Sequence, residues 1–155
     1  MHAESYQTTE VVSPLWAKQF FSEGPKGRFE KLILYSDIPE NFPLVNVGFG
    51  DRIGNSLDFD DRVESKNGDG EKILATVIRT IPEFFIRFPD RILFVQGSTP
   101  SRSFVYRKIV RNYRRDFANQ YTVMGVNQGA AELFLDNVTY EFLLIVPNYL
   151  LHLFK

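Results

Sequence analysis

The sequence predicts an α+β fold, a single domain with a largely antiparallel sheet and two main helices in the order βββαβαβββ. Its 155 residues suit one domain with a core of its own. Two segments, at about 70–88 and 100–117, have the apolar spacing or start signals of helices. The other apolar runs are short and bounded by turn residues, as strands are. Residues 1–12 are polar, so we expect them to be frayed or disordered, with the domain comprising residues 13–155.

The first half of the chain predicts three strands. Residues 16–21 and 29–35 flank a Gly-Pro-containing turn at 23–27, which favours a hairpin. A third strand is expected at 44–50, where two glycines indicate a bulge or a close backbone approach. Residues 51–71 carry seven acidic and three basic side chains and predict a long loop with one short strand around Leu57. The spacing of these acids fits neither an EF-hand loop nor another ligand pattern, so we favour a mobile surface loop over a metal site. We also expect no cofactor.

The helix at about 70–88 has a continuous apolar stripe. Asp69 is its expected N-cap, and Pro82 should kink the helix or end its regular part. The stripe recurs at spacings of three and four residues and comprises Ile73, Leu74, Val77, Ile78, Ile81, Phe84 and Phe85.

A short strand at 91–96 and a basic helix at 100–117 follow. Thr99 is a suitable N-cap, and Pro100 suits the first helical position. Final strands are expected at 121–126, and at 132–135 and 140–146 around an Asp136-Asn137 turn, with residues 127–131 as a loop. The tail at 149–154 is apolar, so it should pack on the sheet or meet a partner.

The start of the basic helix is a candidate anion-binding site. Ser98, Thr99, Ser101 and Arg102 bring hydroxyls, free backbone N–H groups and a guanidinium to one helix N-terminus. The competing interpretation is that Ser98 and Thr99 cap the helix while Arg102 pairs with an acid of residues 51–71. We favour this second interpretation, because Ser/Thr-Pro helix starts are common.

The helix itself carries a candidate partner-binding face. Residues 102–115 have a local charge of +6 with no acid among them. The candidate binding residues are Arg107, Lys108, Arg111, Arg114 and Arg115. Four of them are arginines at i, i+4, i+7 and i+8, which places them on one face. Such a face calls for an anionic counterpart: a nucleic acid, an acidic protein, or the acidic loop of the same or another copy.

Composition excludes several classes of chemistry. The chain has no cysteine, and its two histidines, His2 and His152, lie at the ends. Cysteine nucleophiles and disulfides are excluded, and Ser-His-Asp or zinc sites have no histidine in the body of the chain. No apolar run has the length of a membrane span, so we expect a cytoplasmic protein without membrane contacts.

Two resemblances add to this interpretation. The motifs at 47–51, 67–77 and 97–102, with Tyr106-Arg107, resemble a family of small bacterial proteins of unknown function, common in Bacteroidetes. This resemblance spans about residues 14–146 and implies a bacterial cytoplasmic setting without an activity. The predicted order of elements is also similar to the acyl-CoA-binding core of GNAT acetyltransferases. That similarity would place pyrophosphate at residues 67–70, which lack the expected basic residue and glycine spacing.

The sequence therefore favours a binding protein that engages an anionic partner through the basic helix. One alternative is an enzyme of acyl or phosphoryl transfer that uses residues 97–102. The other is a homo-oligomer formed through the apolar tail.

Overall fold

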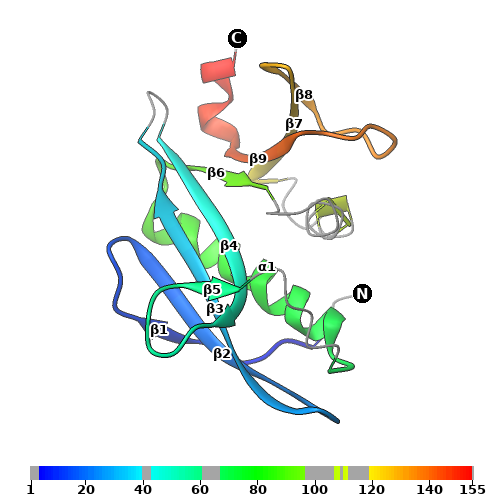
Figure 1. The fold of residues 1–155 in the computed structure, drawn as a ribbon. Coiled ribbons are helices and arrows are strands. Elements are labelled where there is room, and N and C mark those ends of the chain that lie inside the picture. The colour runs from blue at the N-terminus through cyan, green and yellow to red at the C-terminus, as the bar shows by residue number, and fades with distance from the viewer. Residues whose placement is uncertain are drawn as a thin grey trace. The chain divides into compact units, whose positions relative to one another are not determined.

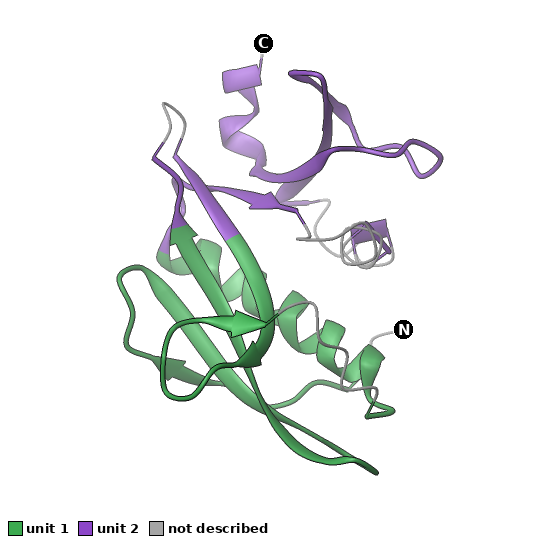
Figure 2. Cartoon of the chain, in the orientation of Figure 1, with its two compact units in different colours: residues 1–36, 47–87 green, residues 37–46, 88–155 purple. Residues whose placement is uncertain are grey.

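The computed structural model describes residues 4–39, 43–60, 67–96, 107–108, 110–111 and 119–154. Its contacts divide the chain into two compact units (Figure 2). Unit 1 comprises residues 1–36 and 47–87, and unit 2 comprises residues 37–46 and 88–155.

The first part of the chain forms β1 (Thr9–Val11), β2 (Trp16–Gly24), β3 (Gly27–Asp37), β4 (Leu44–Arg52), β5 (Phe59–Asp60) and α1 (Gly70–Arg87). The second part forms β6 (Ile92–Val95), β7 (Tyr121–Asn127), β8 (Ala130–Leu133), β9 (Phe142–Pro147) and the 3₁₀ helix η1 (Asn148–Phe154) (Figure 1). Residues 107, 108, 110 and 111 are also helical. The strands pair in the order β1-β2-β3-β4-β6-β9-β7-β8, with β5 on β4. The predicted α+β class, with its largely antiparallel sheet, is confirmed.

The predicted hairpin at the start of the chain is present as β2 and β3. Its antiparallel register runs from Trp16 opposite Tyr35 to Gly24 opposite Gly27. Gly27 has a φ of 115°, a conformation that a residue with a side chain rarely adopts. The pairing of Gly24 with Gly27 limits the turn to two residues, and both strands extend further than the sequence indicated.

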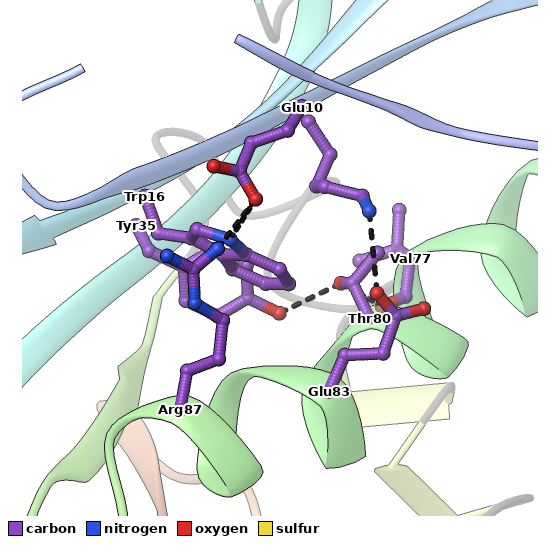
Figure 3. A network of polar contacts seen from close by, with 8 residues as sticks. Glu10, Trp16, Tyr35, Val77, Thr80, Glu83 and Arg87 are labelled. Atoms are coloured by element: carbon purple, nitrogen blue, oxygen red, sulfur yellow. Dashed lines mark hydrogen bonds and ion pairs between the residues drawn. The ribbon is translucent and has the colours of Figure 1, made fainter. Parts of the chain in front are cut away.

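An aromatic cluster joins this hairpin to α1 inside unit 1. The rings of Tyr35 and Phe84 stack with centroids 4.5 Å apart, and Trp16 tilts against Tyr35 at 5.0 Å. The Tyr35 hydroxyl contacts Thr80 Oγ1 at 2.7 Å (Figure 3). Because α1 buries this face, it continues through Pro82 to Arg87, and its regular part does not end at the proline.

Residues 4–12 differ from the frayed segment that we expected. β1 pairs with β2, and Glu10 accepts hydrogen bonds from Trp16 Nε1 at 3.0 Å and from Arg87 Nη1 at 2.5 Å (Figure 3). The backbone N–H of Tyr6 donates to Thr76 Oγ1 at 2.8 Å. These long-range contacts hold the segment, although its local composition is polar.

The acidic stretch begins as part of the sheet. β5 pairs with the end of β4, slightly after the short strand expected around Leu57. A Cβ on Gly50 would lie 2.5 Å from the Asp60 carbonyl oxygen, so the close backbone approach predicted for β4 is confirmed. Asp51 pairs with the buried Lys31 of β3. Residues 61–66 of the expected loop lie outside the described residues.

Unit 2 contains the remaining strands. Leu44–Asn46 of β4 pair in parallel with β6, β9 pairs with β6 and β7, and β7 forms a hairpin with β8. The prediction of a loop at 127–131 is wrong, because Gln128 and Gly129 form a two-residue turn with φ values of 50° and 76°. Positive φ at both central positions matches the twist of a tight hairpin.

The apolar tail packs within unit 2. Leu150, Leu151 and Phe154 of η1 contact a cluster of buried side chains. That cluster comprises Ile92, Met124, Val126, Leu144 and Val146. The expectation that the tail packs back on the sheet is thus met for these three side chains. In the part of the chain that the structure describes, no helix is both long and apolar enough to cross a membrane.

Candidate anion-binding site

A partly enclosed pocket of about 230 Å³ lies in unit 2. One wall consists of basic side chains from the second helical region, and the other is the segment that follows β8. The lining residues are Arg107, Lys108, Arg111, Phe134, Asp136, Asn137, Val138 and Thr139. The pocket therefore brings together two segments that are more than twenty residues apart in the chain.

The basic wall is presented by residues 107, 108, 110 and 111, of which Val110 is buried. Val110 is 3% exposed, whereas Lys108 and Arg111 are exposed and Arg107 is half-buried. Arg107 and Arg111 are four residues apart, so they share a helix face. In the described part of the chain, neither Lys108 nor Arg111 makes an ion pair, whereas Arg107 and Asp136 each have interaction partners.

The opposite wall is held by Tyr140 at the end of the segment. The Tyr140 hydroxyl donates to Glu132 Oε2 at 2.8 Å and accepts the backbone N–H of Leu135 at 3.1 Å. The ring centroids of Tyr140 and Phe134 are 5.8 Å apart. Desolvation, with Glu132 as a further cause, raises the pKa of Tyr140. The phenol is protonated at neutral pH even at its usual pKa near 10, so it can donate this hydrogen bond.

Asn127 supports the same segment from β7. Its Nδ2 donates to the Thr139 carbonyl at 2.8 Å, and its Oδ1 accepts the Glu141 N–H at 2.8 Å. At the other end, the Phe134 N–H donates to the Val123 carbonyl at 3.1 Å. Hydrogen bonds on both sides thus fix residues 134–141, and the pocket wall is organised before any ligand binds.

The charges in the pocket favour an anion. In the part of the lining that the structure describes, three cationic side chains and the carboxylate of Asp136 give a net charge of +2. Arginine presents a planar set of N–H donors that can bind two oxygens of one anion, and lysine adds a point charge. Partial enclosure lowers the effective dielectric and strengthens these interactions relative to an open surface.

The structure brings together three of the sequence-predicted binding residues, Arg107, Lys108 and Arg111. The other predicted site residues, Ser98, Thr99, Ser101, Arg102, Arg114 and Arg115, lie outside the described residues. Sequence reasoning missed the opposite wall at 134–139. The one signal for it was the Asp136-Asn137 turn, which predicts a loop without indicating what the loop faces.

The acidic stretch and the turn before α1 have partners within unit 1. Asp69 accepts hydrogen bonds from Tyr6 and Ser22, both at 2.5 Å. Asn67 is 3% exposed, donates to the Gly27 carbonyl and accepts the Lys26 N–H. This turn therefore braces the β2–β3 hairpin through its side chains. Within the described ranges, no three acidic or histidine side chains form a group that could hold a metal ion.

The fold and the pocket define an α+β domain with a basic, pre-organised cavity. The chain belongs to DUF6934, a family of unknown function, whose model matches residues 2–148. The predicted resemblance to a family of unknown function is thus confirmed over nearly the whole chain. Comparison with curated proteins and with solved structures found no match, so the similarity to acetyltransferases gains no support.

Proposed function

We propose that this chain is a binding protein that takes an anionic partner at the pocket formed by Arg107, Lys108, Arg111 and residues 134–139. The observation that carries the proposal is the position of Lys108 and Arg111. Both are exposed, and both line a pocket whose opposite wall is fixed by hydrogen bonds.

The energetics support an anion at this position. Like charges three or four residues apart on a helix cost a few tenths of a kcal/mol each. A bound anion removes this repulsion and contacts the cations in a partly enclosed space, where a charge pair 4 Å apart has a gross attraction of about 4 kcal/mol. Much of that attraction offsets desolvation, so the net gain is smaller.

The two alternatives have less support. Acyl or phosphoryl transfer would use residues 97–102, which lie outside the described residues. Oligomerisation through the tail would need its apolar side chains, but Leu150, Leu151 and Phe154 pack against the core of unit 2. Tyr149 and Leu153 remain exposed for such a contact.

The test is a charge reversal with a matched control. The double variant Lys108→Glu and Arg111→Glu reverses the two exposed cations of the pocket. The control, Lys26→Glu with Arg79→Glu, makes the same change in net charge at exposed positions of unit 1. Fluorescence anisotropy would measure binding of a labelled ten-nucleotide oligodeoxyadenylate and of labelled polyglutamate, at low and moderate salt.

We expect wild-type protein to bind at least one probe, with affinity falling as salt rises. The affinity of the pocket variant for the probe should fall at least about tenfold, because a loss of about 1.4 kcal/mol in binding free energy corresponds to a tenfold loss of affinity. The control variant should lose much less. Equal losses in the two variants, or no binding of either probe by the wild type, would contradict the proposal.

A further inference from the structure

We infer that the group bound in this pocket is a terminal phosphomonoester, a phosphate attached to its carrier through one oxygen. This inference rests on the proposed anion-binding function and narrows it to one chemical class. It is carried by the charge, the donor groups and the size of the pocket.

The charge of the lining matches a dianion. Among the described lining residues, Arg107, Lys108 and Arg111 with Asp136 give a net charge of +2. A phosphomonoester carries about −1.5 to −2 at pH 7, because its second pKa is near 6. A carboxylate or a phosphodiester carries a single negative charge and would leave the pocket about one unit positive.

The number of cationic groups points the same way. A terminal phosphate has three oxygens that are free to accept hydrogen bonds, whereas a phosphodiester has two. The described residues that line the pocket include three cationic side chains, two of them guanidinium groups suited to binding oxygen pairs. Arg107 has other interaction partners, but Arg111 can bind two oxygens of a monoester and Lys108 the third, so each free oxygen can have a cationic donor.

The size and the second wall limit what the phosphate is attached to. A volume of about 230 Å³ holds a phosphate with an adjoining sugar-sized group, since one water molecule occupies about 30 Å³ of liquid. Asn137 and Thr139 supply polar atoms for the hydroxyls of such a group, and Phe134 supplies an apolar surface. The phosphate could belong to a free nucleotide or sugar phosphate, or to the 5′ end of a nucleic acid.

The test compares monoesters with a diester of the same nucleoside. Isothermal titration calorimetry would use AMP and ribose 5-phosphate as monoesters, cyclic AMP as the diester and adenosine as the uncharged control. We expect at least one monoester to bind tenfold or more tightly than cyclic AMP at pH 7.5, and adenosine to show no binding. The variant Lys108→Ala with Arg111→Ala should lose this preference, and Lys26→Ala with Arg79→Ala should keep it.

A second arm uses the titration of the ligand. The charged side chains lining the pocket in the described residues are Arg107, Lys108, Arg111 and Asp136. Between pH 7.5 and pH 5.0 the monoester gains a proton, but the diester does not. A change in the affinity for cyclic AMP between these pH values therefore comes from the protein itself. Relative to cyclic AMP, the affinity for the monoester should fall several-fold at pH 5.0.

The source of the phosphate is read from an oligodeoxyadenylate with and without a 5′-phosphate. Tighter binding of the phosphorylated oligonucleotide than of AMP assigns the group to a nucleic-acid end, and the reverse assigns it to a small molecule. Both results require the monoester preference. If cyclic AMP binds as tightly as both monoesters, or if no monoester binds, the inference is wrong. The proposed function would still stand if the labelled polyanions bind to the protein and the charge reversal weakens their binding.

Discussion

The ring of Tyr140 lies directly against Gly125 of β7. A Cβ added to Gly125 would be 2.3 Å from Tyr140 Cε1, closer than any real contact of this kind. The absence of a side chain at this position lets the buried ring reach β7. From there its hydroxyl contacts Glu132 and Leu135, at the base of the pocket wall.

Gly125→Ala should therefore destabilise the protein. The new methyl group would displace a buried ring, and overpacking of this kind costs about 1–3 kcal/mol. Urea unfolding followed by circular dichroism would measure the change. Gly70→Ala is the control, because a Cβ there meets no atom within 4 Å. Equal effects of the two substitutions would show that Tyr140 does not constrain Gly125.

Tyr140→Phe separates the hydroxyl from the ring. The ring would still pack on Gly125 and Phe134, while Glu132 and the Leu135 N–H would lose their hydrogen-bond partner. We expect a loss of about 1 kcal/mol in the free energy of unfolding. Because residues 134–139 would be less fixed, affinity for the anionic probes should fall a few-fold. Unchanged affinity would show that Tyr140 does not organise the pocket.

Thr80 and Tyr35 form a buried pair in unit 1. Thr80 Oγ1 donates to the Val77 carbonyl at 2.6 Å, so the Tyr35 hydroxyl is the donor to Thr80 Oγ1. Thr80→Val should cost about 1–3 kcal/mol, because it leaves a buried hydroxyl without an acceptor. The same substitution in a Tyr35→Phe background should cost clearly less. A double-mutant cycle with no coupling would contradict this pairing.

Burial of Tyr35 also predicts sensitivity to alkaline pH. Desolvation raises the pKa of Tyr35 well above its usual value near 10. As pH rises past 10, the unfolded chain releases this proton first, so the stability contributed below pH 10 is progressively lost. Urea unfolding between pH 9 and 11.5 should show a decline that is less steep in Tyr35→Phe. Parallel declines in the two proteins would contradict the assignment.

The sequence predicted those parts of the fold that depend on local pattern. The apolar stripe of α1 and the glycine-containing turn between β2 and β3 were sufficient to place these elements. Long-range contacts decided the rest. Glu10 is ordered because Trp16 and Arg87 approach it from distant parts of the chain, and no local signal near Glu10 indicates this.

The candidate site was predictable on one side. The spacing of Arg107 and Arg111 identifies a basic helix face from the sequence alone. The facing segment is defined by strand pairing and by the support of Asn127 and Tyr140, which follow from the register of β7 with its neighbours. Period and propensity do not encode such a register.

The proposed site is tested by locating the residues at which an anion binds. In a titration of ¹⁵N-labelled protein with AMP, we expect amide shifts to change mainly at residues 107–111 and 134–141. In the Lys108→Ala and Arg111→Ala variant, the same addition of AMP should not change the amide shifts of those residues. Shift changes confined to unit 1, for example around Asp69 and the start of α1, would contradict the proposed site.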